Sequence, residues 1–164
     1  MHKLLLLLLI QGFDNCKRQN GGRRELVNRI DSLEKKLANF YEPGFGEFMS
    51  SIQEHHSKLW FAGQEQNWKL ADFEVHEIME AIDDIKNYET ERKESQLIGM
   101  IRPAIDSVNH AIQQKSPARF RDYFMLHTGT CNKCYQAANF AFNVVKTPET
   151  SQFSNQEFKV NDPK

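Results

Sequence analysis

The clearest chemistry in this chain lies in one stretch, Cys131-Asn132-Lys133-Cys134-Tyr135. In the motif Cys-x-x-Cys-His, the two thiols add across the vinyl groups of a haem, and the histidine that follows becomes an iron ligand. Both thiols are present here at that spacing, but Tyr135 occupies the position of the histidine. The stretch therefore predicts a haem attachment site that lacks its proximal ligand.

Other chemistry of Cys131 and Cys134 stays open. Two cysteines one helical turn apart can form a disulfide, or they can remain buried thiols that pack as small apolar side chains. Metal binding and redox chemistry are further alternatives. A thioredoxin-like dithiol is less favoured, because it needs a helix N-terminus after a strand, and no strand pattern occurs in the sequence.

Several histidines could supply metal ligands. His127 and Cys131, four residues apart on one helix face, form the best pair. His56 or His76 could join them from facing helices. No His-x-x-x-His pair marks a ligand face, however. A transition-metal site at His127, His56 and His76 is therefore an alternative to histidines that only pack or face solvent.

The N-terminus is typical of an export signal. A basic start precedes an apolar run from Leu4 to Ile10, which is shorter than the roughly 20 residues that span a bilayer. Cys16 then predicts a bacterial lipoprotein signal over residues 1–16, in which the thiol is lipidated and anchors the protein to a membrane. An ordinary cleaved signal or a retained anchor is the alternative. We expect a periplasm-facing or surface lipoprotein of the bacterial cell envelope.

Length and composition limit the remaining possibilities. The chain has 164 residues and a formal net charge of -1, which allows one core but offers no basic stripe for nucleic acid. No nucleophile triad or phosphate-binding glycine loop is discernible, so we expect no enzyme. Residues 17–24 predict a flexible linker, residues 25–41 an amphipathic helix, and residues 148–164 an irregular tail.

The amphipathic helix carries a narrow apolar stripe. Its apolar residues alternate at spacings of four and three, at Leu26, Ile30, Leu33, Leu37 and Phe40. This is a heptad pattern, which is typical of coiled coils. The stripe could form a homo-oligomer through residues 25–41 or lie against the rest of the chain.

Four further helices are predicted within residues 43–147. The first ends at Gly63 as a left-handed cap, and the second has Asn67 as its N-cap, with Glu74 on the outside. Pro103 should kink the third. The fourth begins at Ser116-Pro117 and continues to Pro148, with an inner face of Phe120, Phe124, His127, Cys131, Cys134, Ala138, Ala141 and Val145. We therefore predict an all-α, antiparallel four-helix bundle preceded by an amphipathic coiled-coil-like helix.

These features together resemble the cytochrome c-prime superfamily of four-helix bundles, in which haem attaches near the C-terminal end of the last helix. A group of exported bacterial cytochrome-like proteins is more narrowly similar, and its last helix ends in Cys-Asn-x-Cys-His. The resemblance covers Pro43 to roughly Phe158. It rests on His56-x-Lys58-Leu59-Trp60-Phe61-Ala62-Gly63 with Asn67-Trp68-x-Leu70-Ala71-x-Phe73-Glu74, and on Cys131-Asn132-x-Cys134.

The resemblance implies haem held by Cys131 and Cys134, with Met49 in the place of the distal ligand of low-spin relatives. Its proximal position maps to Tyr135, and tyrosinate ligation gives a very different potential from His/Met ligation. The interpretation is an envelope-anchored relative with weak or no covalent haem. The alternatives are a haem electron-transfer protein that uses Met49 and has an unknown redox partner, and a metal-binding, redox or haem-free interaction module.

Replacing Cys16 with serine should move the protein from the membrane pellet to the soluble periplasm. The reason is that a lipid anchor gains about 0.8 kcal/mol for each CH₂ group that it buries in the bilayer. Fractionation of cells that express the variant measures the change. An unchanged distribution, together with no lipid mass at the N-terminus, would rule out the anchor.

Overall fold

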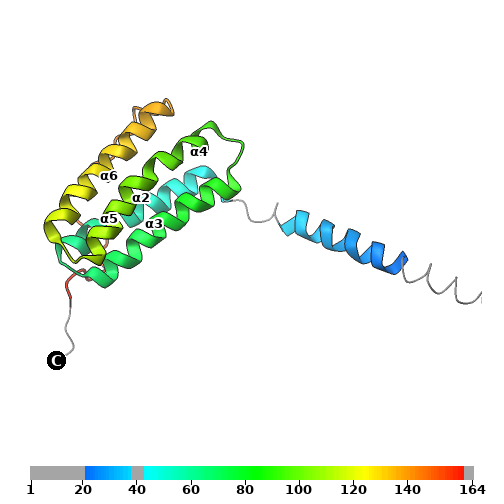
Figure 1. Cartoon of the computed structure of the whole chain (residues 1–164), viewed down its shortest axis with the longest axis horizontal. Coiled ribbons are helices and arrows are strands. Elements are labelled where there is room, and N and C mark those ends of the chain that lie inside the picture. The colour runs from blue at the N-terminus through cyan, green and yellow to red at the C-terminus, as the bar shows by residue number, and fades with distance from the viewer. Residues whose placement is uncertain (1–20, 38–42, 161–164) are drawn as a thin grey trace, which may run out of the picture. The chain divides into compact units, whose positions relative to one another are not determined.

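The computed structural model describes residues 21–37 and 43–160, which belong to two separate units (Figure 1). Cys16 and the signal predicted over residues 1–16 lie outside the described residues. Residues 21–37 are helical, which agrees with the amphipathic helix as far as residue 37. The prediction of a flexible linker was wrong for residues 21–24, because Arg23, Arg24 and the residues after them favour a helix.

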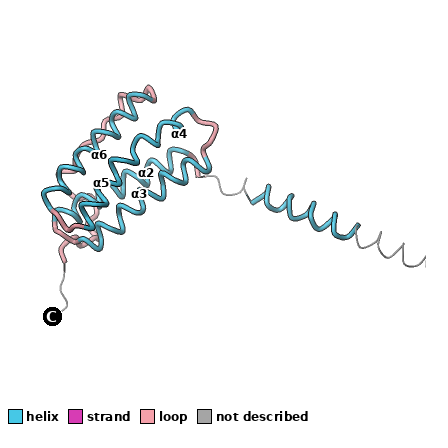
Figure 2. The backbone as a smooth tube through the Cα atoms, in the orientation of Figure 1, coloured by secondary structure: helices cyan, strands magenta, loops and turns pink. Residues whose placement is uncertain are grey.

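Residues 43–160 form a helical bundle without strands (Figure 2), which confirms the all-α prediction. Its elements are α2 (Phe45–Gln64), α3 (Trp68–Tyr88), α4 (Lys93–Leu97), the 3₁₀ helix η1 (Ile98–Ile101), α5 (Arg102–Gln113) and α6 (Pro117–Ala137). Throughout the described part of the chain, every helix is too short or too polar to cross a membrane.

The inner faces of these helices form one apolar core, as the spacing of the apolar residues predicts. Its fully enclosed side chains come from every long helix: Leu59, Val75, Ile78, Ile82, Ile85, Ile105, Val108, Phe120 and Phe124. The Asn67 side chain caps α3 by accepting the Leu70 N–H at 3.2 Å, as predicted. The core thus fixes which faces of α2 and α6 meet.

The connection between α4 and α5 shows the effect of Pro103. Proline has no N–H to donate to the carbonyl four residues earlier, and its ring disfavours a continuous helix. The chain passes through η1, and the Arg102 N–H donates to the carbonyl of Gly99 instead. The predicted helix is therefore interrupted one turn before the proline.

Three of the described helices end in the same hydrogen-bonded turn, the Schellman motif. A residue with positive φ follows each helix, at Gln66 (55°), Lys115 (49°) and Asn139 (67°). The next N–H then reaches back into the last turn, from Asn67 to Ala62, from Ser116 to Ala111 and from Phe140 to Tyr135. None of the three left-handed residues is glycine.

These turns correct two predicted helix ends. Gly63 is not the left-handed cap but a residue of α2, and Gln66 takes that conformation instead. The last helix ends at Ala137 rather than before Pro148, because Asn139 turns the chain. Ala141, predicted inside, is exposed. The irregular tail therefore begins about ten residues earlier than its predicted start.

The tail folds back onto the bundle through two phenylalanines. The Phe158 ring is buried and lies 5.5 Å from the Phe61 ring, and the Phe158 carbonyl accepts a hydrogen bond from Asn67 Nδ2 at 3.2 Å. The Lys58 ammonium lies 4.8 Å from the centre of the Phe153 ring. Apolar burial and one polar tie therefore hold this segment in place.

Gly63 allows α2 and α6 to approach closely. A Cβ at this position would lie 2.1 Å from Cε1 and Cζ of Phe120, and Phe120 is completely buried. With a Cβ at residue 63, this enclosed ring or one of the two helices would have to shift. The absence of a side chain at Gly63 is therefore a packing requirement.

Replacing Gly63 with alanine should lower the free energy of unfolding by about 1–3 kcal/mol, because overpacking forces a buried ring or a helix to shift. Urea denaturation of the purified protein measures the loss. Gly129→Ala in α6 is the matched control, since its Cβ would meet nothing within 4 Å. That variant should gain about 0.5–1 kcal/mol from helix propensity. Equal stability of Gly63→Ala and wild type would contradict the close approach.

Candidate functional site

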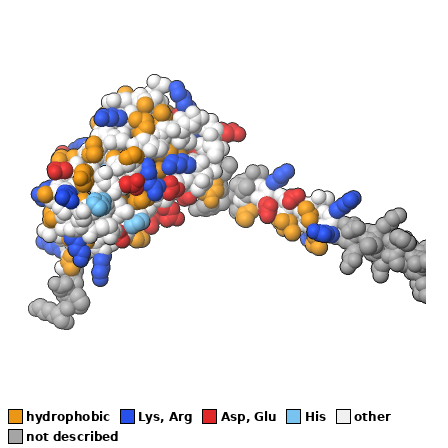
Figure 3. All heavy atoms as spheres, in the orientation of Figure 1, with side chains coloured by type: hydrophobic (Ala, Val, Ile, Leu, Met, Phe, Trp, Pro, Cys, Tyr) orange, Lys and Arg blue, Asp and Glu red, His pale blue; other side chains and the backbone are white. Residues whose placement is uncertain are grey.

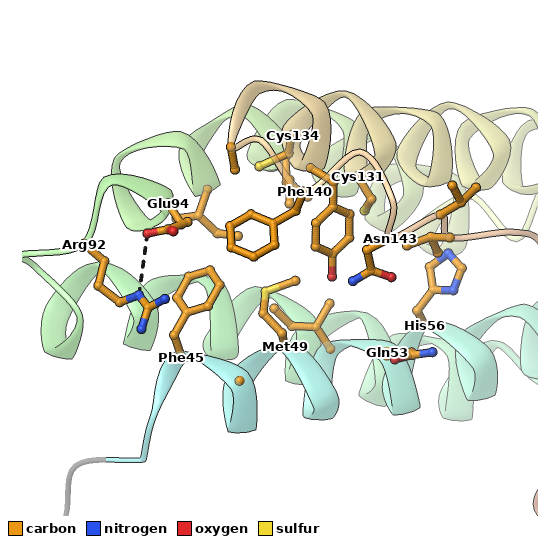
Figure 4. Close-up of a pocket in the computed structure, with 18 residues that line it drawn as sticks. Phe45, Met49, Gln53, His56, Arg92, Glu94, Cys131, Cys134, Phe140 and Asn143 are labelled. Atoms are coloured by element: carbon orange, nitrogen blue, oxygen red, sulfur yellow. Dashed lines mark ion pairs between the residues drawn. The ribbon is translucent and has the colours of Figure 1, made fainter.

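A cavity of about 310 Å³ lies between the start of α2, the α4–η1 segment, the end of α6 and the chain that follows α6 (Figure 4). The four residues predicted for a haem site all line it: Met49, Cys131, Cys134 and Tyr135. The structure therefore brings the predicted haem residues together. The volume is near the lower limit of about 300–1,000 Å³ for small-molecule sites.

The wall of the cavity is mainly apolar. Phe45 and Met49 point from α2 toward Cys134, and Phe140 lies between them and the thiol (Figure 4). At one end, the Arg92 guanidinium lies 5.0 Å from the centre of the Phe45 ring and 3.6 Å from a Glu94 oxygen. The ion pair leaves most of the cavity without charge.

The register of α2 and α6 places these groups. Going along α2, His56 contacts Thr128, the Trp60 ring lies 4.8 Å from the Phe124 ring, and Gly63 faces Phe120. The partners on α6 come in reverse order, so the two helices lie antiparallel. The start of α2, with Met49, consequently faces the end of α6, with the two cysteines.

Both cysteines are buried free thiols. Cys131 Sγ lies 3.9 Å from His127 Nε2, and the Cys134 thiol donates to the Leu97 carbonyl at 3.7 Å. Burial, with a smaller contribution from Cys134, raises the pKa of Cys131 to about 12, and burial raises the pKa of Cys134 as well. Both therefore stay protonated at neutral pH, which makes them weak nucleophiles.

Tyr135 has the same electrostatic surroundings. Burial, and then the neighbouring Cys131 and Cys134, raise the pKa of its phenol above the ordinary value. The phenol is therefore neutral at physiological pH, and a neutral phenol is a poor iron ligand.

His56 and His127 form a buried pair whose ring centres lie 5.8 Å apart. The Thr128 hydroxyl donates to the Phe124 carbonyl at 2.9 Å. It must therefore accept the 2.9 Å hydrogen bond from His56 Nε2, which assigns the proton of His56 to that nitrogen. His127 Nδ1 is buried without a hydrogen-bond partner.

Both histidines are neutral. Burial lowers the pKa of His56 to about 4. Burial, with a smaller effect of His56, lowers the pKa of His127 to about 3. Neutral imidazoles suit metal binding, but His76 is exposed and bonds the Asp72 carbonyl at 2.7 Å. His76 therefore does not join the pair.

Within residues 21–37 and 43–160, no group of three or more histidine, cysteine or acidic side chains is arranged to hold a metal ion. The predicted set of His127, His56 and His76 is therefore not assembled as a metal site. His127 and Cys131 do lie together, as their spacing predicts. Their contact is that of a neutral imidazole with a protonated thiol.

Sequence reasoning missed the position of Glu74. It is 2% exposed rather than outside, and its carboxylate contacts His55 Nδ1 at 2.6 Å. His55 also lies 3.9 Å from a Glu77 oxygen. The signal was present, because Glu74 lies three and four residues from the buried Ala71 and Ile78 and so shares their helix face.

Comparison of the chain with protein-family models, with curated proteins and with solved structures finds no match.

The buried histidines predict a specific loss of stability in mild acid. Their folded pKa values, about 4 and about 3, lie below the ordinary value of 6.5, so the unfolded chain takes up protons first as the pH falls through 6.5. Between about pH 6 and pH 4, each histidine should therefore remove about 1.4 kcal/mol of stability for each pH unit.

His127→Phe isolates one of these contributions. Between pH 7 and pH 5 this variant should lose about 2 kcal/mol less unfolding free energy than the wild type. Urea denaturation at both pH values measures the difference, and His76→Gln serves as the exposed control. Equal losses in His127→Phe and wild type would contradict the burial of a neutral His127.

Proposed function

We propose that this protein is an exported, envelope-anchored, antiparallel four-helix bundle of the cytochrome c-prime type that has weak or no covalent haem. In this proposal α4, η1 and α5 together count as one helix, beside α2, α3 and α6. The cavity at Met49, Cys131 and Cys134 then serves as a binding site for a small apolar molecule.

The arrangement of α2 and α6 supports the fold assignment. In low-spin relatives of the cytochrome c-prime superfamily, a methionine near the start of the first bundle helix is the distal iron ligand. Met49 lies on the first turn and a half of α2, and it shares a cavity with Cys131 and Cys134. Contacts such as the 2.8 Å pair of Asp83 with Arg102 connect α3 to α5.

The residues present do not fit a c-type haem. This conclusion is supported by Tyr135, which stands where the attachment motif has its histidine and whose phenol has a pKa that burial raises. In addition, Phe140 stands beside Cys134 (Figure 4), and the cavity of about 310 Å³ lies at the lower end of the range for small-molecule sites. No step of a haem mechanism is therefore assigned to this chain.

The cavity suits a compact apolar ligand. Its lining offers aromatic and aliphatic surface from Phe45, Met49, Ile52, Ile98, Ile101 and Phe140. Removing such surface from water contributes about 25 cal/mol for each Å². The hydroxyl of Tyr135, which stays protonated, can donate one hydrogen bond and thereby orient a ligand that has a polar atom.

A functional haem electron-transfer protein is the second candidate. It is favoured by one observation, which is that Met49 and both thiols line the same cavity. It would require iron ligation by Met49 and by a group other than neutral Tyr135. A Soret band in protein from the native host would support this candidate and contradict the first.

Tyr135→His should restore the attachment motif. Expressed with a cytochrome c maturation system, this variant should carry covalent haem, whereas the wild type should carry little or none, because only the variant has an imidazole to hold iron. Absorption spectra and intact mass measure the attached haem. Tyr135→Phe is the matched control, since it removes the hydroxyl without adding a ligand.

Strong covalent haem in the wild type or in Tyr135→Phe would contradict the proposal. A folded Tyr135→His that takes up no haem would show instead that Phe140 and its neighbours have closed the space, since protein interiors are too densely packed to admit a porphyrin afterwards.

A further inference from the structure

The helix over residues 21–37 exposes a continuous apolar stripe. Four side chains on one face are at least half exposed: Leu26 (60%), Ile30 (52%), Leu33 (62%) and Leu37 (71%). Apolar side chains are visible along this helix in Figure 3. Single exposed leucines are ordinary on protein surfaces, but a contiguous stripe indicates a binding surface.

The stripe has the register of a coiled coil. Its spacings of four, three and four place Leu26 and Leu33 at d positions of a heptad, and Ile30 and Leu37 at a positions. Across the span from Leu26 to Leu37, a little less than two heptads, the four side chains stay within a narrow arc of the helix. An isolated helix of this length is marginal in water, so a partner that covers the stripe would stabilise it.

The charges beside the stripe identify the partner. Arg29 and Lys36 occupy the g positions, and Glu34 occupies an e position. In a parallel two-stranded coiled coil, each g residue faces the e residue five positions later on the other helix. Arg29 would therefore face Glu34 of the partner subunit, and the symmetry of a dimer repeats this pair.

We infer that residues 21–37 pair with the same segment of a second copy of this chain, as a parallel two-stranded coiled coil held in register by Arg29 and Glu34 of the partner subunit. An antiparallel pair is disfavoured, because it sets g against g and brings Arg29 near Lys36 of the partner subunit. Ile30 at an a position, with leucines at d, favours two strands. This inference does not depend on the proposed function of the bundle.

Charge reversal tests both the partner and the orientation. Two differently tagged copies of the full chain are expressed together, and the amount of one that co-purifies with the other is measured. Wild-type copies should co-purify. Arg29→Glu with itself, and Glu34→Arg with itself, should each co-purify about tenfold less, because two attractive pairs become two repulsive ones. Arg29→Glu with Glu34→Arg should recover the wild-type amount.

Lys35→Glu is the matched control. Lys35 is exposed at the outer f position and lies four residues after Asp31, just as Arg29 lies four residues after Glu25, so the two reversals place like charges at the same spacing within the helix. This control should co-purify like the wild type. Failure of wild-type copies to co-purify would overturn the inference. The apolar stripe would then be covered by the bundle of the same chain or by a membrane. Undiminished pairing of Arg29→Glu with itself would overturn the parallel register.

Discussion

The site depends on one constraint, which is that the inner face of α6 is buried against α2 with no charge to compensate for the loss of water. Burial disfavours the charged form of every titratable group. His127 is completely buried and Cys131 nearly so, so the imidazole stays unprotonated and the thiol stays protonated. The phenol of Tyr135 follows the same rule. Apart from the Arg92–Glu94 ion pair at one end, the cavity is therefore an uncharged, mainly apolar space, although it is lined by residue types that often carry charge or bind metals.

The chain after α6 forms the other side of this space. Asn139 adopts the left-handed conformation that ends the helix, and asparagine does so more readily than most residues other than glycine. The side chain of Asn132 then holds the segment that runs back along the bundle after α6. Its NH₂ group donates to the Val145 carbonyl at 2.9 Å, and its carbonyl oxygen accepts the Val145 N–H at 2.8 Å. The asparagine between the two cysteines thus has a structural role. It fixes the segment that brings Phe140 beside the thiols.

Periodicity was sufficient to predict the helical class and the inner faces, because burial of apolar residues at spacings of three and four leaves few alternatives. It placed Phe120, Phe124 and His127 inside, where the structure has them. The end of α6 was not predictable in this way, since apolar residues continue at helical spacing to Val145 and the turn residue is Asn139 rather than glycine. The pattern of apolar residues contains no information about a turn that depends on backbone hydrogen bonds.

The remaining differences between the predicted and the observed structure arise from contacts between residues that are distant in the sequence. A glycine near a helix end can be a cap or a point of close approach, and only the position of Phe120 decides that Gly63 is the latter. Glu74 lies inside because His55, on another helix, provides a partner for its carboxylate. The candidate site was predictable in its members, Met49, Cys131, Cys134 and Tyr135. The absence of charge in the site could not be predicted, because it depends on how deeply α6 is buried.

Native mass spectrometry of the protein isolated from its own host tests the central claim most directly, namely that the cavity at Met49, Cys131 and Cys134 holds a small apolar ligand rather than covalent haem. We expect the mass of the chain with a small, non-covalently bound molecule that is lost on denaturation, and no mass of haem on the peptide that contains the two cysteines. Haem that remains attached to that peptide after denaturation would show that the cavity is a haem site.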